Sequence, residues 1–258
     1  MRGLLSRRAL ASIAVGVCML AACGDDGSSA ATTVPVSGGI TVFAASSLTA
    51  AFKDIGAAFE AQVPGTMVTL NFAASSDLVT QINQGAPVDV FASADQANVK
   101  KLTTPPPAGS AVFATNSLQI IVAPGNPKHI TTVADLARPD VTFVTGAADV
   151  PIGKYTQQVL AKAGVKVTPK SLEANVKAIV SKVTLGEADA GAVYVTDVLA
   201  AGSNAAGVVI PTDLNVRAEY PIVVLAGAPN AATASAFVAF VLSPAGQDIL
   251  KKYGFSAP

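Results

Sequence analysis

The chain has 258 residues, of which 51% are hydrophobic and 13% charged, so it can bury one large or two modest cores and is not a disordered chain. Its formal net charge is zero, but three of its arginines, Arg2, Arg7 and Arg8, lie in the first eight residues. From Cys23 onward, 14 Lys and Arg oppose 17 Asp and Glu, a net charge of about −3 that argues against a nucleic-acid partner.

The N-terminus has the pattern of a lipoprotein signal peptide over residues 1–22. A basic start precedes an apolar run, residues 9–22, that is short for a membrane span. Small residues then come directly before Cys23, an arrangement similar to the bacterial lipobox, which predicts cleavage before Cys23 and a lipid such as palmitate on it. An uncleaved membrane anchor with an incidental cysteine is the alternative.

The segment that follows, residues 23–39, predicts a flexible tether because it is rich in Gly, Ser, Ala and Thr. Cys18 is lost with the signal peptide and Cys23 carries the lipid, so no disulfide is expected in the mature chain. The expected location is therefore the extracytoplasmic face of the cell membrane, with the domain attached by its lipid.

Two strand-to-helix turns each place serines where a helix begins. The two turns are, in chain order, strand 40–45, Ser46-Ser47 and a helix from Leu48, and then strand 69–73, Ala74-Ser75-Ser76 and helix 77–84. Hydroxyls and unpaired backbone N–H groups at the positive end of a helix dipole favour an anion. Plain helix capping is the alternative for each serine. For Ser46 and Ser76, the sequence leaves open whether they contact a ligand or only shape their turns.

The later elements continue the alternation of strands and helices. They are, in chain order, strand 88–92, helix 93–102 capped by Ser93, an irregular connection 103–109, strand 117–123, a short helix 131–137, strand 141–145, a helix between loop 146–151 and Gly164, a helix capped by Asn175 and ending near Gly186, strand 190–195, strand 220–226, and helices 231–242 and 244–252. This order predicts an α/β fold with mostly parallel sheets and ligands at the carboxyl ends of the strands.

Catalysis is poorly supported, so we expect a binding protein and not an enzyme. The single histidine, His129, lies in a loop, and the chain has no Cys/His cluster, no Gly-x-Ser-x-Gly turn and no phosphate loop with lysine. Asp89, Asp95 and Asp189 could still pair in space. A surface lipoprotein enzyme with paired carboxylates therefore remains an alternative.

Seven sequence blocks, spread over the whole mature domain, resemble the molybdate-binding component of bacterial ABC importers. The blocks are Val42-Phe-Ala-Ala-Ser-Ser-Leu-Thr49, Phe72-Ala-Ala-Ser-Ser-Asp-Leu78, Gly85-Ala-Pro-Val-Asp-Val-Phe-Ala-Ser-Ala-Asp95, Asn116-Ser-Leu118, Val193-Tyr-Val-Thr-Asp197, Glu219-Tyr-Pro221 and Lys252-Tyr-Gly-Phe255. Each block is modest alone, but in this order they are specific.

The resemblance implies a two-lobed, hinged fold like that of type II periplasmic binding proteins, with the ligand in the cleft between the lobes. Lobe one would comprise residues 40–116 and 220–258, and lobe two residues 117–219. The implied function is to bind molybdate or tungstate outside the membrane and deliver it to an importer. Its partners would be the transmembrane permease and the ATPase subunits, and we expect a monomer without a cofactor.

The resemblance also implies a set of ligand-binding residues. The hydroxyls of Ser47, Ser75 and Tyr194 and the backbone N–H groups of Ile152 and Val176 would hold the oxyanion, without Lys or Arg in contact. The alternative is that Tyr194 is simply a buried tyrosine of a strand and that Ile152 and Val176 are ordinary core residues.

A site built only of donors suits a fully ionised oxyanion such as molybdate, which offers only acceptors. Phosphate keeps a proton near neutral pH and rewards a site with an acceptor, which the five positions lack. Sulfate matches molybdate in charge and shape, so a protein that binds sulfate or another anion remains the alternative within the class of binding proteins.

Overall fold

The structure is a computed structural model that describes residues 36–258. The predicted signal peptide, Cys23 and most of the predicted tether lie outside the described residues. The first strand begins at Gly38, two residues earlier than its predicted start and inside the segment assigned to the tether.

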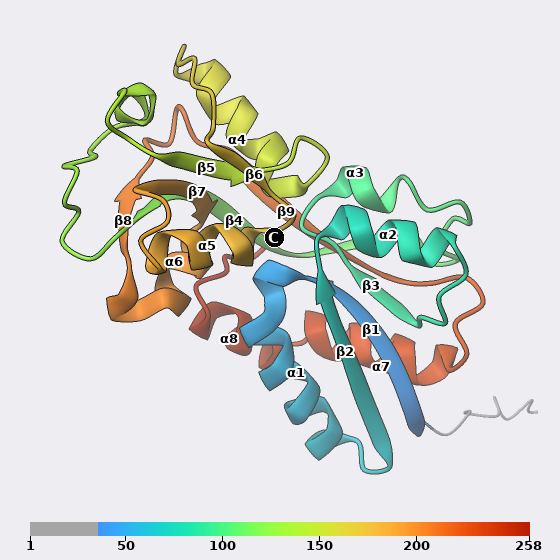
Figure 1. Ribbon diagram of the computed structural model, residues 1–258. Coiled ribbons are helices and arrows are strands. Elements are labelled where there is room, and N and C mark those ends of the chain that lie inside the picture. The colour runs from blue at the N-terminus through green and yellow to red at the C-terminus, as the bar shows by residue number, and fades with distance from the viewer. Residues whose placement is uncertain (1–35) are drawn as a thin grey trace, which may run out of the picture. The chain divides into compact units, whose positions relative to one another are not determined.

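The described residues alternate between strands and helices (Figure 1). The strands are β1 (Gly38–Ala45), β2 (Thr66–Ala73), β3 (Val90–Ala92), β4 (Ala111–Val122), β5 (Phe143–Gly146), β6 (Ser171–Glu173), β7 (Ala190–Tyr194), β8 (Ala206–Val209) and β9 (Arg217–Val224). The α-helices are α1 (Thr49–Gln62), α2 (Ser75–Asn83), α3 (Gln96–Val99), α4 (Pro151–Lys162), α5 (Val176–Thr184), α6 (Val195–Ala201), α7 (Ala231–Leu242) and α8 (Pro244–Lys252). The 3-10 helices are η1 (Ser46–Leu48), η2 (Val133–Ala137) and η3 (Gly202–Asn204).

The strands pair in the order β2-β1-β3-β9-β4-β7-β5-β6, with β8 also paired to β4. The long strand β4 joins two groups of strands, because residues 111–117 pair with β9 and residues 118–122 pair with β7 and β8. We call β1, β2, β3, β9 and residues 111–117, with the helices packed on them, the β1 half. The β7 half comprises β5 to β8 and residues 118–122, with their helices.

The prediction of mostly parallel sheets needs correction. β1 is parallel to β2 and β3, and β5 is parallel to β6 and β7. In contrast, β4 and β9 run antiparallel to every strand with which they pair. The hydrophobic pattern locates a strand but does not report the direction of its partner, which long-range pairing decides.

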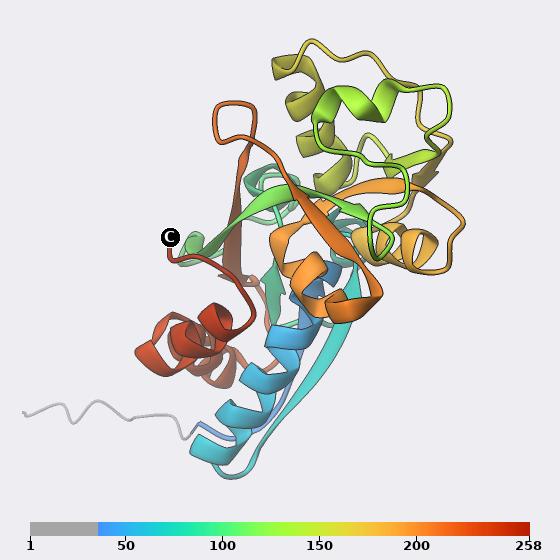
Figure 2. The ribbon, with the colours of Figure 1, turned by 90° about the vertical axis from the view of Figure 1, so that its left-hand side faces the viewer.

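The β1 half has helices on both faces of its sheet because alternate residues of a strand point to opposite faces. On one face of this sheet lie α1, α7 and α8 (Figures 1 and 2). Val42 and Ala44 of β1 belong to a core with residues of these helices. Rings from these helices pack edge to face there, with the centroids of Phe59 and Phe237 5.4 Å apart. On the other face, Phe43 packs in a second cluster with residues of α2 and α3.

Several helix boundaries follow the sequence closely. The ranges of α7 and α8 match their predictions, and Asn175 caps α5 as predicted by accepting the backbone N–H of Ala178 at 3.1 Å. The predicted helix 93–102 is wrong in its start, extent and cap. It shrinks to α3, and its cap is Asp95, because Ser93 instead donates its hydroxyl proton to the carbonyl of Asp95 at 2.8 Å.

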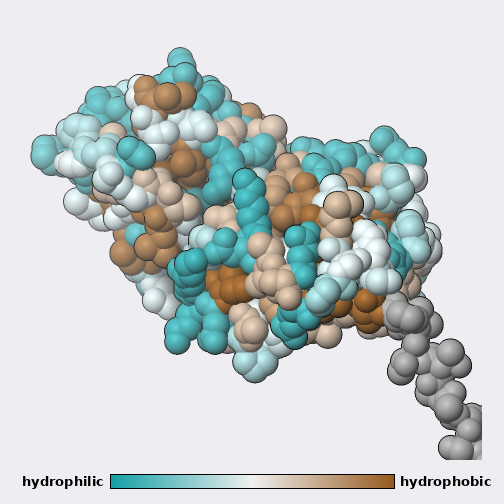
Figure 3. Space-filling model, turned by 90° about the horizontal axis from the view of Figure 1, so that it is seen from below, coloured by the Kyte–Doolittle hydropathy of each residue, from teal (hydrophilic) through white to brown (hydrophobic). Residues whose placement is uncertain are grey.

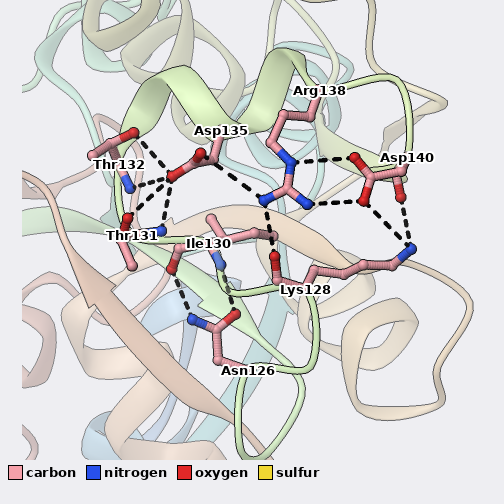
Figure 4. A network of polar contacts seen from close by, with 8 residues as sticks. All are labelled: Asn126, Lys128, Ile130, Thr131, Thr132, Asp135, Arg138 and Asp140. Carbon is pink, nitrogen blue, oxygen red and sulfur yellow. Dashed lines mark hydrogen bonds and ion pairs between the residues drawn. The ribbon is translucent and has the colours of Figure 1, made fainter.

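The predicted short helix near residues 131–137 is the 3-10 helix η2, held by a polar network (Figure 4). Asp135 accepts the backbone N–H groups of Thr131 and Thr132 at 2.9 and 2.8 Å. These bonds to the carboxylate lower the pKa of Asp135 to about 2. Nearby, the guanidinium group of Arg138 donates hydrogen bonds from two of its nitrogens to the carboxylate of Asp140.

The surface of the described residues combines hydrophilic and hydrophobic side chains (Figure 3). The larger apolar side chains exposed on it are scattered along the chain and are Val36, Met67, Leu172, Leu185, Leu199, Val209 and Leu242. On the face drawn in Figure 3, hydrophobic residues lie in small groups between hydrophilic ones. No single helix within residues 36–258 is long and apolar enough to cross a membrane. The helices α7 and α8, with a bend of 61° between them, reach that length and apolar composition only when they are taken together.

Candidate functional site

A small pocket lies where helices of both halves begin. Its lining consists of residues at the ends of strands and the starts of helices, namely Ala45, Ser46, Ser47, Ala73, Ala74, Ser75, Ala94, Val150, Pro151, Ile152, Val176 and Tyr194. The structure therefore brings together all five positions that the sequence proposed. The free space in this pocket is about 10 Å³, close to the least that a single water molecule requires.

The lining residues converge because β1, β2 and β7 each end at the pocket and lead directly into a helix. β1 leads into η1, β2 into α2 through Ala74, and β7 into α6. The pocket also receives the starts of α4 and α5. The backbone N–H groups in the first turn of a helix have no partner within that helix, so several free donors and positive dipole ends meet at one point.

Ser47 and Ser75 are buried, and each hydroxyl oxygen already has one neighbour within the protein. The oxygen of Ser75 accepts the backbone N–H of Ala94 at 3.0 Å. The hydroxyl of Ser47 lies 3.1 Å from that of Tyr220. Since the Ala94 N–H can only donate, the proton of the Ser75 hydroxyl stays available for a ligand.

Tyr194, at the end of β7, contributes the third hydroxyl. Its side chain is only 1% exposed, and its hydroxyl has no hydrogen-bond partner within residues 36–258. Burial raises the pKa of this hydroxyl, and the neighbouring Tyr220 and Tyr155 hydroxyls add to the effect, so it remains protonated. Because a buried polar group without a partner is costly, this hydroxyl fits a site completed by a ligand that accepts a hydrogen bond from it.

The starts of α4 and α5 supply backbone donors. α4 begins with Pro151, which has no N–H, so Ile152 carries the first backbone N–H of that helix. In α5, the side chain of Asn175 occupies the N–H of Ala178, which leaves the N–H of Val176 at the first helical position for another partner. The side chains of Ile152 and Val176 are buried in the core, so only their backbone groups are suited to contact a polar ligand.

Gly153 brings the start of α4 close to the preceding loop. A Cβ atom at this position would overlap the backbone carbonyl oxygens of Gly146 and Ala147. Only glycine therefore allows the first turn of α4 to lie against this loop.

The residues that line the pocket include no Lys, Arg or His. Two lysines near it are paired with carboxylates: Lys154 with Asp95 at 3.1 Å and Lys177 with Asp197 at 2.9 Å. The Asp197 carboxylate is fully buried and also accepts the backbone N–H of Tyr194 at 3.2 Å. Burial raises the pKa of Asp197, and Lys177 partly opposes this effect. The ion pairs thus leave the pocket with neutral donors.

Replacing Lys177 with methionine should lower the free energy of unfolding by about 1 to 3 kcal/mol, because the buried Asp197 carboxylate loses its cation. Urea denaturation measures this change. The double variant Lys177→Met with Asp197→Asn should recover most of it, since the Asn carbonyl can still accept the N–H of Tyr194. A double variant no more stable than the single one would contradict this explanation.

Two polar contacts join the halves beside the pocket. Lys154 and Tyr155, from α4 of the β7 half, reach residues just after β3 of the β1 half. Lys154 pairs with Asp95, and the hydroxyl of Tyr155 donates to the carbonyl of Ala94 at 3.2 Å. Ala94 thereby connects this contact to Ser75, to which it donates its own N–H.

The carboxylates considered for catalysis have structural partners. Asp89 accepts the backbone N–H groups of Thr41 and Asn230, both at 2.8 Å, and Asp189 accepts that of Thr142 at 2.8 Å. Asp95 caps α3 and pairs with Lys154. His129 is exposed in its loop and is not among the lining residues. Within residues 36–258, no group of three His, Cys, Asp or Glu side chains is placed to hold a metal ion.

Sequence reasoning missed two contributors, Ala94 and Tyr220. Both lie inside blocks that carry the family resemblance, which was the available signal. Their partners, Ser75 and Ser47, are 19 and 173 positions away, so no local pattern links them.

The chain is similar to several known proteins in sequence and in fold. The family model described as "Bacterial extracellular solute-binding protein" matches residues 40–256. The molybdate-binding protein ModA of Mycobacterium tuberculosis strain H37Rv is 41% identical over 246 residues, which cover 93% of each chain. Two solved structures share the fold at low identity. The periplasmic molybdate-binding protein of Azotobacter vinelandii has a TM-score of 0.74 at 21% identity, covering 85% of this chain and 99% of that one. The sulfate-binding protein SubI of M. tuberculosis H37Rv has a TM-score of 0.75 at 20% identity, covering 85% and 86%.

Proposed function

Because the chain belongs to the family of bacterial extracellular solute-binding proteins and has their two-lobed, type II α/β fold, we propose that it captures molybdate and tungstate outside the cytoplasmic membrane and delivers them to an ABC importer. The relative named as a molybdate-binding protein, 41% identical over nearly the whole chain, supports this ligand. The fold alone would not distinguish a molybdate-binding protein from a sulfate-binding one, because a sulfate-binding protein shares this fold.

The observation that carries the proposal is a pocket lined by buried residues with uncharged donors, in which the Tyr194 hydroxyl has no partner within the described residues. A dianion that leaves water needs every oxygen paired, and hydroxyls with helix-start N–H groups can supply these bonds. The hydroxyls of Ser47, Ser75 and Tyr194 and the N–H groups of Ile152 and Val176 are the proposed donors. An acceptor-only oxyanion uses them all, whereas a protonated one needs an acceptor in return.

We assign lobe one to residues 40–116 and 220–258, and lobe two to residues 117–219. The change of pairing partners along β4, near Asn116, supports the first boundary. The pairing of β9 with β3 supports the second boundary, where the chain passes back into lobe one. Ser47 and Ser75 then belong to lobe one and the other three donors to lobe two, so the anion stabilises the closed form. The bonds from Lys154 and Tyr155 to the opposite lobe add to this closure.

The closed, liganded monomer would present both lobes to the permease, and ATP hydrolysis by the partner subunits would drive release. No turnover is part of this function. The partners of Asp89, Asp95 and Asp189 support that view, because each carboxylate is engaged in a structural role.

A thermal-shift screen of the chain from residue 24 onward against molybdate, tungstate, sulfate, phosphate and citrate tests the ligand. A ligand at a hundred times its dissociation constant adds about 2.7 kcal/mol to the stability of the folded state. This gain corresponds to a rise in Tm of roughly 5 to 10 °C for a domain of this size. Stabilisation by molybdate and tungstate is the expected result. Stabilisation by sulfate or citrate alone would replace the proposed ligand, and consumption of a substrate would contradict a purely binding role.

We also propose that a lipid on Cys23 attaches the domain to the outer surface of the cytoplasmic membrane. The small residues before Cys23 and the Gly- and Ser-rich segment after it support the anchor. The full-length Cys23→Ala variant should lose the acyl group in intact-mass measurement of the membrane-extracted protein. An acylated variant, or wild-type protein without a lipid, would contradict the anchor.

A further inference from the structure

The hydroxyl of Ser47 is paired with a residue outside the pocket. Tyr220 comes from β9, far along the chain, and its hydroxyl lies 3.1 Å from that of Ser47. Both side chains are buried, with exposed fractions of 7% for Ser47 and 0% for Tyr220. Tyr220 is not among the lining residues, and it contacts two residues that are, Ser47 through its hydroxyl and Tyr194 through its ring.

Aromatic neighbours fix the ring of Tyr220. Three rings pack edge to face against it, with centroid distances of 5.4 Å to Phe255, 5.9 Å to Tyr194 and 6.3 Å to Phe113. Such packing leaves the ring little freedom, so its hydroxyl has a fixed place beside Ser47. Phenylalanine at this position would keep the packing and remove only the hydroxyl.

The chemistry of the two hydroxyls favours one direction for their hydrogen bond. A phenol is a stronger donor than an aliphatic hydroxyl, since the tyrosine hydroxyl has a pKa near 10 and that of serine does not titrate in water. Burial raises the pKa of Tyr220 further, and its bond to Ser47 opposes this only in part, so Tyr220 keeps its proton. With Tyr220 donating, the Ser47 oxygen accepts, and the Ser47 proton is free to point into the pocket.

Ser75 shows the same arrangement with a different partner. Its oxygen accepts the N–H of Ala94, a group that can only donate. Each serine oxygen thus accepts a hydrogen bond from a protein donor, and its own proton is free for a ligand in the pocket. At Ser75 the backbone sets this direction, and at Ser47 a side chain sets it.

We propose that Tyr220 is a positioning residue that makes Ser47 a hydrogen-bond donor and thereby selects fully deprotonated tetrahedral oxyanions over those that keep a proton. This inference rests on the proposed function, because it concerns the same pocket. Without the Tyr220 hydroxyl, the Ser47 oxygen becomes free to accept a hydrogen bond from the O–H of a protonated ligand.

The test compares dianions that differ by one proton. At about pH 8, molybdate and tungstate carry no proton, whereas phosphate is mainly a dianion that keeps one. Isothermal titration calorimetry and competition would give the affinities of the wild type and of Tyr220→Phe for all three. The matched control is Tyr253→Phe, which removes a hydroxyl bonded to Asp54 at 2.7 Å, outside the pocket lining.

Tyr220→Phe should bind molybdate and tungstate about 2- to 10-fold more weakly, the effect of one neutral hydrogen bond. Phosphate should lose less affinity or gain some, so the ratio of molybdate to phosphate affinity falls. Tyr253→Phe should leave the ratio unchanged. An unchanged molybdate affinity, an equal loss for all three anions, or a variant that still binds no measurable phosphate would overturn the inference. A wild type that binds none of the anions would instead overturn the proposed function itself.

Discussion

Replacing Ser75 or Ser47 with alanine is expected to weaken molybdate binding by roughly 10- to 100-fold, because each variant loses a hydrogen bond to a charged ligand worth about 1.5 to 3 kcal/mol. Titration calorimetry of purified wild type and variants measures the loss directly. The two variants should differ in stability, however. Ser75→Ala also leaves the buried N–H of Ala94 without its acceptor, whereas Ser47→Ala leaves the hydroxyl of Tyr220 without its partner.

A suitable control is Ser235→Ala, since this exposed serine of α7 bonds only to a carbonyl of its own helix, that of Ala231 at 2.7 Å. Its molybdate affinity should equal that of the wild type. If the affinity of Ser47→Ala or Ser75→Ala also stayed at the wild-type value, that serine would have to be removed from the proposed site.

Gly153→Ala is expected to lower the free energy of unfolding by about 1 to 3 kcal/mol and to weaken molybdate binding as well. The added methyl group would meet the backbone carbonyls of Gly146 and Ala147, which cannot move aside as a flexible side chain could. The first turn of α4 must then shift, and with it the backbone N–H of Ile152. Urea denaturation and calorimetry measure the two effects.

Gly56→Ala provides a control of opposite sign. This glycine lies within α1, and a Cβ there would meet the side chains of Val68 and Leu70 at an ordinary contact distance of 3.6 Å. Alanine in a helix interior is more favourable than glycine by about 0.5 to 1 kcal/mol, so this variant should be more stable than the wild type. If Gly153→Ala proved as stable as the wild type, the close approach of α4 to its loop would not need a glycine.

The sequence alone revealed the local parts of the candidate site. Ser47 and Ser75 were recognisable because a strand pattern changes to a helical pattern at each of them, and Asn175 because it stands where a helix begins. The ends of α7 and α8 were equally clear, since Pro244 follows one helix and starts the next. Hydrophobic periodicity and capping act over a few residues, and such short-range preferences can be read directly from a sequence.

Contacts between distant segments were harder to predict from the sequence. It did not indicate α6 or β8, and it shortened β4, whose two parts pair with different neighbours. The direction of the strands was also misjudged, because β4 and β9 owe their antiparallel pairing to segments about a hundred residues away. Pairing of this kind depends on which distant residues the chain brings together.

The pocket itself shows the same division. Local sequence determined that donors would gather at helix starts, and the resemblance to a known family indicated which of them to consider. Only the tertiary structure decided that the hydroxyl of Tyr220 lies beside that of Ser47, that Ala94 donates its N–H to Ser75, and that the Tyr194 hydroxyl lacks a protein partner among the described residues. Whether a hydroxyl can donate a hydrogen bond to a ligand depends on which protein group already bonds to its oxygen. In a folded chain that group can come from any distance along the sequence.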